Sequence, residues 1–463
     1  MLKPKESSQS EYEFVSIDEL VPDNHLLLLI DKYIDFSFLL EKVRPFYSED
    51  NGRPSDPLIL FKMMFIGYLF GIRSERQLER EIKMNIAYWW FLGLKFHDPV
   101  QHHSTISWNR QHRFKVINTE IDTDIFQEIF DEIVLQAMNH KMVGGRVLFT
   151  DSTHLKANAN NHKFTKEEVE VETREYLEDL NKAIEEDRIN HGKKPLKEKE
   201  EVKETKEIRV STTDPECGFM SRENKQEMFC YLDHRTTDMK FNIITDVYVT
   251  PGNVHDSVPY LNRLDRQVQR FGFMVEAVAL DSGYLTNPIC KGLSDSNIFG
   301  VIAHSRFHPT TGLFLKWKFT YDKERDLYIC PNNQELPYKT TTREGYREYK
   351  SDSKKCESCP FLSQCTRSKN KVKVVTRHVW EEHKEKVRIN RLSKSGKELY
   401  KFRKEKIERS FADSKELHGL RYCRLRGIKK ASEQALLTAA CQNMKKIATH
   451  LFRLEKVCCN SLV

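Results

Sequence analysis

The sequence predicts an α/β protein with a helical N-terminal domain and a cysteine-containing insertion, and three observations support this class. The chain has 463 residues, 39% of them hydrophobic, which is enough for two or three domains with buried cores. Apolar runs of strand length occur between residues 144 and 298. Four cysteines gather in a basic stretch further along the chain. We therefore expect a sheet domain between a helical domain and a small separate module.

The helical domain is predicted over residues 14–115, where apolar residues recur at three- and four-residue spacing. An example is the run Leu26, Leu29, Ile30 and Tyr33. Segments 73–78 and 104–110 resemble a DNA-binding helical unit, because a Ser or Thr cap opens a helix that carries Arg110. The alternative is an ordinary capped helix that packs Ile106 inward. We expect a DNA-binding domain here, with Arg110 as a candidate contact.

Two short apolar runs of the sheet domain each end at an aspartate followed by serine. The first run, 144–149, precedes Asp151, and the second, 275–280, precedes Asp281. A lone aspartate in this position is usually a helix cap or a turn residue. The repeated context instead favours two carboxylates fixed at strand ends, where they can bind a hard cation.

The residues between these aspartates predict further elements of the same domain. Residues 229–250 alternate like two antiparallel strands, and Asp256 is expected to cap a following helix rather than to bind metal with His255. Asp246 is expected at the sheet surface. The Glu- and Lys-rich segment 163–209 predicts an exposed helical hairpin inserted into the domain.

The third carboxylate is expected on a helix predicted over 396–415. At about 100° per residue, Lys404, Glu408 and Lys415 share one stripe, so a carboxylate lies between two cations. Such a stripe suits a metal ligand beside DNA phosphates. Glu405 competes with Glu408 for this role, and a helix with simple i to i+4 ion pairs remains an alternative. The sheet domain is thus predicted over 144–298 and 396–455.

The charge distribution bears on partners and location. The net charge is +7, but residues 367–409 hold 16 Lys and Arg against 6 Glu, a local net of +10. This can attract a phosphate backbone, although a solvated helix face is an equal alternative. There is no signal-peptide pattern, and the apolar stretch 58–70 is interrupted by Lys62 and is too short to span a bilayer. We expect a cytoplasmic protein without a membrane partner.

The cysteines indicate one metal site and no disulfide framework. Eleven is an odd number, and most of the cysteines are scattered singly among apolar residues. The exceptions are Cys330, Cys356, Cys359 and Cys365, where a C-x-x-C pair with two further thiols predicts structural zinc. Reduced cysteines in a basic loop are the alternative. We expect these four in an insertion module over 299–390.

Several motifs of this chain resemble the DDE transposases of bacterial insertion sequences. They are Thr150-Asp151-Ser152, residues 250–256, Leu280-Asp281-Ser282-Gly283-Tyr284, and residues 407–415 followed by His418-Gly419-Leu420-Arg421. The resemblance covers about residues 14–453. It implies a ribonuclease H-like catalytic core, Mg²⁺ or Mn²⁺ as cofactor, and cleavage and strand transfer on double-stranded DNA at terminal inverted repeats. A homodimer on DNA and a nucleoid-associated location follow from the same resemblance.

The resemblance also assigns residue roles. It makes Asp151, Asp281 and Glu408 the catalytic metal ligands and Lys415 a DNA-phosphate contact, and its candidate DNA contacts further include Arg403, Lys404 and Arg421. A related signature has Tyr and Arg seven and four residues before the glutamate. This chain has lysines there, with Tyr400 and Arg403 one position earlier, so the roles of Arg403 and Lys404 stay open. A nuclease without strand transfer and a non-enzymatic DNA-binding derivative are the other function classes.

Overall fold

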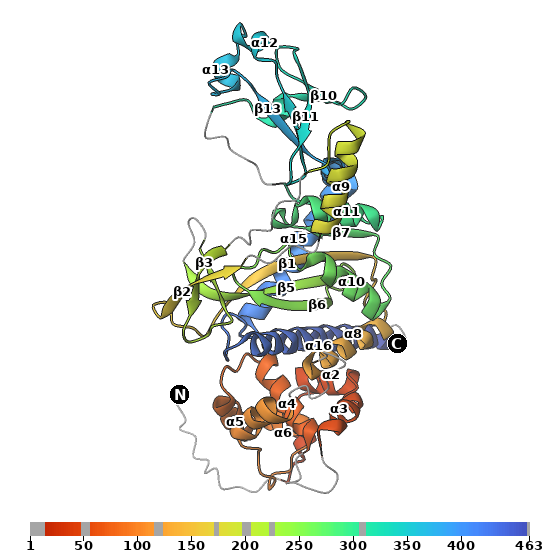
Figure 1. Cartoon of the computed structure of the whole chain (residues 1–463). Coiled ribbons are helices and arrows are strands. Elements are labelled where there is room, and N and C mark those ends of the chain that lie inside the picture. The colour runs from red at the N-terminus through yellow and green to blue at the C-terminus, as the bar shows by residue number, and fades with distance from the viewer. Residues whose placement is uncertain are drawn as a thin grey trace, which may run out of the picture.

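The computed structural model shows three bodies arranged along one long axis (Figure 1). A helical domain lies at one end, a mixed sheet domain in the middle, and a small β module at the other end. The structure describes residues 14–47, 56–114, 124–170, 176–196, 205–221, 227–304 and 312–460.

The N-terminal body is helical, as predicted. Its longest inner helix, α4, is apolar around most of its surface and is buried along most of its length, with Asp56 as its N-cap. The elements are α1 (Ile17–Leu20), α2 (Leu26–Tyr33), α3 (Ser37–Val43), η1 (Arg44–Phe46), α4 (Pro57–Leu69), α5 (Glu75–Met84), α6 (Ile86–Leu92), α7 (His103–Trp108), η2 (Asn109–Arg113) and α8 (Ile125–Asn139).

The middle body is built on one mixed sheet in the order β4-β5-β1-β7-β8, with β6 also paired to β5. Strand β1 runs antiparallel to β5 and parallel to β7, and β7 runs parallel to β8. The strands are β1 (Val147–Lys156), β4 (Gly218–Met220), β5 (Met228–Asp238), β6 (Ile244–Pro251), β7 (Ala277–Leu280) and β8 (Phe299–Ile302). An antiparallel half joined to a parallel half through β1 is the ribonuclease H-like arrangement, so the predicted fold class is confirmed.

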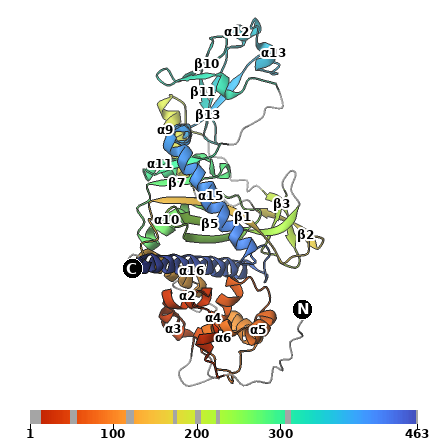
Figure 2. The same cartoon turned by 180° about the vertical axis from the view of Figure 1, so that it is seen from behind.

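Two long helices fix the sheet in the molecule. Helix α15 (Lys394–Glu416) crosses one face of the sheet, as Figure 2 shows from the side opposite to Figure 1. Helix α16 (Ile428–Asn460) lies between the sheet and the N-terminal helices, where Asn443 bonds both backbone groups of Ile244. The remaining helices of this body are α10 (Tyr260–Phe271), η3 (Ser282–Tyr284), α11 (Asn287–Asp295) and α14 (Glu381–Leu392). Among the described residues, no helix is both long and apolar enough to cross a bilayer.

Two predictions for this body were wrong. The charged insertion is not a helical hairpin, because β2 (Phe164–Glu170) pairs antiparallel with β3 (Thr205–Ser211), and α9 (Leu177–Asn190) is the one helix among its described residues. The direct cross-strand partners Lys166 and Arg209 carry like charges, as do Glu168 and Glu207, and a diagonal 2.8 Å ion pair of Lys166 with Glu207 joins the two pairs. Asp246 is fully buried rather than at the surface, because Arg263 pairs with it.

The third body is the cysteine module, and it is narrower than predicted. Strand β8 pairs with β7 and α14 packs on β8, so both belong to the sheet domain. The module is an antiparallel sheet in the order β13-β12-β11-β10-β9, with two short helices. Its elements are η4 (Lys316–Lys318), β9 (Thr320–Asp322), β10 (Leu327–Ile329), β11 (Glu335–Thr341), β12 (Tyr346–Lys350), α12 (Ser353–Glu357), α13 (Leu362–Cys365) and β13 (Val374–His378).

Candidate active site

Asp151 lies at the point where β1 is no longer paired with β7. Strand β1 does not end at Asp151 as predicted but continues to Lys156. Strand β7, however, ends at Leu280, which pairs with Thr150. Asp151 is therefore the first residue of β1 beyond the parallel ladder, and Asp281 is the first residue after β7. The two aspartates border the same open edge of the sheet.

Both aspartates face helix α15. Phe149 and Ala279 pack in one cluster with Tyr400 of α15, and side chains alternate along a strand, so the residue two positions later points to the same side. The contacts agree with this geometry. Arg403 Nη2 lies 2.7 Å from Asp151 Oδ2, and the Tyr400 hydroxyl donates to Asp281 Oδ1 at 3.4 Å. Helix α15 thus holds each aspartate through a different side chain.

The site carries excess negative charge on half-buried side chains. Burial, together with the charges of Asp281 and Asp256, raises the pKa of Asp151 to about 6 against the lowering effect of Arg403. One guanidinium cannot balance three carboxylates. A divalent cation would supply the missing charge, and carboxylate oxygens are the donors that Mg²⁺ and Mn²⁺ prefer. The residues present therefore fit such an ion.

Asp256 was missed as a member of this site. It does not cap a helix, because α10 begins only at Tyr260 with Pro259 as its cap, which corrects the prediction. Its Oδ1 atom accepts a 2.6 Å hydrogen bond from Ser152 Oγ. A signal was present in the sequence, since Asp256 follows the end of an apolar strand, as Asp151 and Asp281 do.

Glu408 lies on the exposed surface of α15, next to buried Ile407. Lys415 of the same helix donates from Nζ to Thr153 Oγ1 at 2.6 Å, so the flank that carries Lys415 adjoins β1 just beyond Asp151. At about 100° per residue, Glu408 is roughly 20° from Lys415 and 80° from Tyr400, whereas Glu405 is roughly 80° and 140° away. The helix geometry thus favours Glu408, which remains a prediction as the third ligand.

Two segments of the chain match known protein families. Residues 329–448 match the family described as "Transposase DDE domain", and residues 15–112 match "Transposase domain (DUF772)". The second match covers the helical domain from α1 to α7, and the first covers most of the cysteine module together with α14, α15 and most of α16. By both matches, the function of the chain is that of a DNA transposase. The resemblance inferred from its motifs is confirmed.

Comparisons with whole proteins add only distant likenesses. No curated protein matches the transposase. Among solved structures, a piggyBac transposase synaptic complex with hairpin DNA is 10% identical, with a TM-score of 0.37 over 92% of this chain and 75% of the other. A Mos1 transposase paired-end complex with the left transposon end is 11% identical, with a TM-score of 0.16 over 55% of this chain and 61% of the other. No residue role is taken from either.

The predicted DNA contacts of the transposase separate into exposed and buried side chains. Lys404 is exposed on α15, and Arg421 is half exposed and paired with Glu416. Arg403 is buried and pairs with Asp151, so it is Arg403 and not Lys404 that contacts this aspartate. Arg110 is buried as well, and its ion pairs with Glu75 and Glu433 join the helical domain to α16. Its burial argues against a direct DNA contact.

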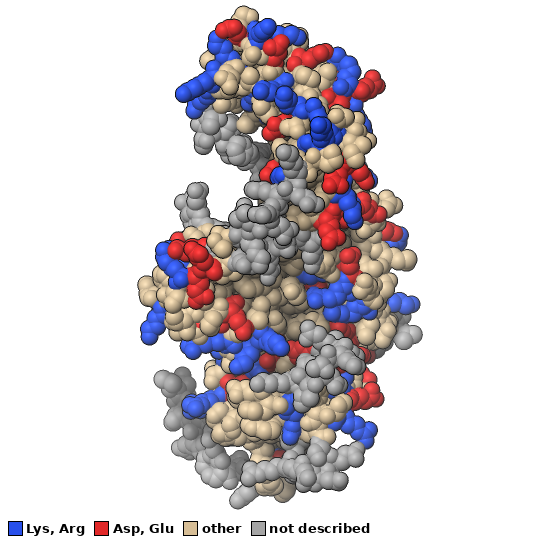
Figure 3. Space-filling view, viewed as in Figure 1, with Lys and Arg blue, Asp and Glu red and all other residues tan. Residues whose placement is uncertain are grey.

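The charged surface differs from one part of the transposase to another. Figure 3 shows the face turned away from α15, where Lys and Arg are interspersed with Asp and Glu over the sheet domain. On that face, a group of Lys and Arg lies at the left part of the boundary between the sheet and the helical domain.

The four predicted zinc ligands come together in the cysteine module. Cys330, Cys356, Cys359 and Cys365 line one small cavity, and burial raises the pKa of Cys365, with the other three thiols adding to the effect. Among the described residues, no three of these sulfur atoms lie within 4.8 Å of one another. The cluster is therefore assembled but wider than a closed tetrahedral site.

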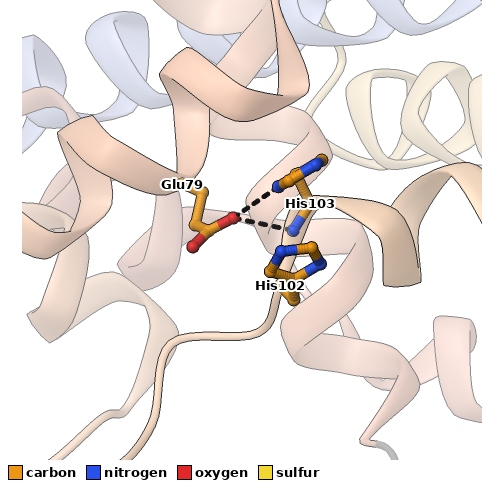
Figure 4. A group of neighbouring side chains, drawn as sticks. All are labelled: Glu79, His102 and His103. Carbon is orange, nitrogen blue, oxygen red and sulfur yellow. Dashed lines mark hydrogen bonds and ion pairs between the residues drawn. The ribbon is translucent and has the colours of Figure 1, made fainter.

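A second cluster of metal-type residues lies in the helical domain, formed by Glu79, His102 and His103 (Figure 4). Glu79 Oε2 accepts from the backbone N–H of His103 at 2.9 Å and lies 2.8 Å from its Nδ1. Lys83 also bonds Glu79, and Arg76 donates to His103 Nε2. These contacts hold the pKa of Glu79 at about 2, the bond from Lys83 contributing most. Hydrogen bonds that join α5 to α7 account for this cluster.

Proposed function

We propose that this transposase cuts and joins DNA at the ends of a bacterial insertion sequence, with Mg²⁺ or Mn²⁺ held by Asp151, Asp281 and Glu408. One observation carries the proposal: two aspartates border the edge of the β1/β7 ladder and face the helix that bears the glutamate. The aspartates sit on strands of a large core, which fixes their backbones before any ion binds. The enzyme would act on DNA at the nucleoid, in the cytoplasm.

The residues around the aspartates have distinct tasks in this proposal. Arg403 offsets part of the charge of Asp151, and Tyr400 orients Asp281. When bound, divalent ions would activate the attacking oxygen and stabilise the leaving oxygen of an in-line displacement. The Ser152 backbone N–H holds Asp151 Oδ1 at 2.9 Å, so one oxygen of Asp151 faces backbone and the other faces Arg403.

DNA is expected along the flank of α15 that carries Lys404 and Lys415. Lys415 is half-buried beside Thr153, and burial lowers its pKa, with Arg421 adding to the effect. A cation in this place can bind a phosphate close to the carboxylates. The helical N-terminal domain would recognise the terminal inverted repeats, and pairing of two element ends calls for a homodimer on double-stranded DNA.

A strand-transfer assay tests the reaction itself. A pre-cut element end is incubated with target DNA and Mg²⁺, using wild-type protein, Asp151→Asn and the exposed control Glu276→Gln. We expect joined products from the wild type and the control, and none from Asp151→Asn, which should still bind the element end. Hydrolysis without joining would favour a nuclease, and binding without any cleavage by the wild type would favour a non-enzymatic derivative.

A structural zinc ion in the cysteine module is the second part of the proposal. The observation that supports it is the convergence of Cys330, Cys356, Cys359 and Cys365 on one cavity. The backbone N–H of Gln334 points at Cys330 Sγ from 3.4 Å, a contact that suits a thiolate. Elemental analysis of purified protein should find one zinc per chain, and Cys356→Ser should lose it. Equal zinc in both proteins would overturn the assignment.

A further inference from the structure

Asp256 connects the two aspartate motifs of the active site from a third chain segment. Its Oδ1 atom accepts from Ser152 Oγ at 2.6 Å, directly beside Asp151. Its Oδ2 atom lies 3.5 Å from the position that a Cβ on Gly283 would occupy, two residues after Asp281. The absence of a side chain at Gly283 leaves this close approach open. Asp256 therefore lies between residues 151–152 and residues 281–283, although it is about a hundred residues from Ser152 in sequence.

Two fully buried polar groups surround this carboxylate without satisfying it. His234 Nε2 is bonded to Thr250 Oγ1 at 2.9 Å, but its Nδ1 lies 4.0 Å from Asp256 Oδ1 and has no hydrogen-bond partner in the described part of the chain. The Tyr284 hydroxyl also has no partner among those residues, and burial raises its pKa, with Asp256 and Asp151 adding to the effect. Buried polar atoms are normally paired. Their arrangement around Asp256 indicates a ligand at this position.

The charges around Asp256 point to a cation. Asp151, Asp256 and Asp281 contribute three negative charges, and the ion pair of Arg403 with Asp151 returns one positive charge. His234 does not help, because burial lowers its pKa and keeps it neutral. The group is thus left with a net charge of −2 on half-buried side chains, which costs free energy unless a counter-ion binds.

We propose that Asp256 is a further ligand of the divalent cation held by Asp151 and Asp281. The inference rests on the proposed function, because it uses the same cation. A purely structural role would make Asp256 the anchor of the Ser152 side chain and nothing more. The two roles differ in what happens when the Ser152 hydroxyl alone is removed.

Mn²⁺ titration calorimetry on the full chain without DNA separates these roles. We expect Asp256→Asn to weaken Mn²⁺ binding by about tenfold or more, the size typical of residues that support a metal site. Ser152→Ala should weaken binding clearly less than Asp256→Asn does, since it deletes one hydroxyl and keeps every carboxylate. Glu276→Gln, which removes an exposed carboxylate from the other end of β7, should bind as the wild type does. Thermal melting without Mn²⁺ checks that each variant folds.

Two results would overturn the inference. One is wild-type Mn²⁺ affinity in Asp256→Asn, and the other is an equal loss in Asp256→Asn and Ser152→Ala. In either case a loss of binding in Asp151→Asn would leave the proposed function standing, whereas unchanged binding in Asp151→Asn would remove both.

A thiolate substitution gives a second readout that does not depend on the asparagine variant. Asp256→Cys should bind one more Cd²⁺ through sulfur than the wild type, seen as added thiolate-to-metal absorbance, because Cd²⁺ prefers soft ligands. The same spectrum in both proteins would contradict ligation at this position.

Discussion

The two candidate cation sites of this transposase differ in what supports them. The carboxylates lie on or directly after strands of the large core that joins the sheet to the helical domain. The cysteines lie on the short helices α12 and α13 and beside a turn, around a core of five buried side chains. A large core can hold ligands in place without their ion, whereas a small module often depends on its metal for folding. Loss of an ion should therefore cost activity in the first site and structure in the second.

The largest predicted effect that tests this comparison concerns Asp281. Asp281→Asn should reduce Mg²⁺-dependent cleavage by about a thousandfold, equivalent to about 4 kcal/mol in the barrier, because a cation ligand is lost. The melting temperature should hardly change, since helix α15 holds Asp281 through the long, 3.4 Å hydrogen bond from the Tyr400 hydroxyl. Cleavage of a labelled element end and a melting curve measure both quantities. A strongly lowered melting temperature would contradict the separation of activity from folding.

The reverse pattern is expected in the cysteine module. Cys359→Ser should speed proteolysis within residues 314–378 by roughly tenfold, because the module opens more often without its zinc. The sheet domain should keep its protection. Limited proteolysis followed by mass spectrometry locates the cuts, and Cys290→Ser, a buried cysteine of α11 outside the cluster, serves as the comparison. Equal cutting in both domains would show that the module has no separate dependence on metal.

A smaller effect sharpens the link between the sheet domain and the helical domain. His418 is buried at the end of α15 and bonds the Tyr68 carbonyl of α4 from Nδ1 at 2.9 Å. Burial lowers its pKa to about 4, from 6.5 in an unfolded chain. Between these pH values His418 is protonated in the unfolded chain and neutral in the folded chain. The free energy of unfolding therefore falls as the pH drops from about 6.5 to 4, by at most about 3 kcal/mol.

Denaturant unfolding at several pH values measures how the free energy of unfolding changes with pH. His418→Asn keeps a hydrogen-bond donor but cannot titrate, so its free energy of unfolding should change less with pH over the same window. An identical slope in the variant and the wild type would show that His418 is not responsible.

The smallest effect concerns Lys404 on the exposed flank of α15. Lys404→Ala should weaken binding of the element end several-fold. It should also make the slope of log K against log salt concentration shallower by about one, as expected for the loss of a single phosphate contact. Fluorescence anisotropy at several salt concentrations checks this, with exposed Lys193 of the charged insertion as a matched lysine control. A shallower salt dependence in Lys193→Ala than in Lys404→Ala would place the DNA elsewhere.

Much of the fold was readable because its signals are local. Apolar runs before Asp151 and Asp281 predicted both strands, and the helix predicted over 396–415 agrees with α15 to within two residues at each end. The failures depended on long-range contacts. Whether Arg403 or Lys404 contacts Asp151 depends on how α15 is rotated against the sheet. The role of Asp256 depends on α10 starting three residues later than a cap at Asp256 would place it. The ribbon of the charged insertion was not predicted, because its two strands β2 and β3 lie far apart in the sequence.

The central claim, that the carboxylates at the edge of the β1/β7 ladder bind the catalytic cation, is tested most directly by locating Mn²⁺ in crystals of the transposase. The account predicts an anomalous peak about 2.1 Å from oxygens of both Asp151 and Asp281. A peak at Glu79 and His103 in the helical domain, with none at the two aspartates, would contradict it.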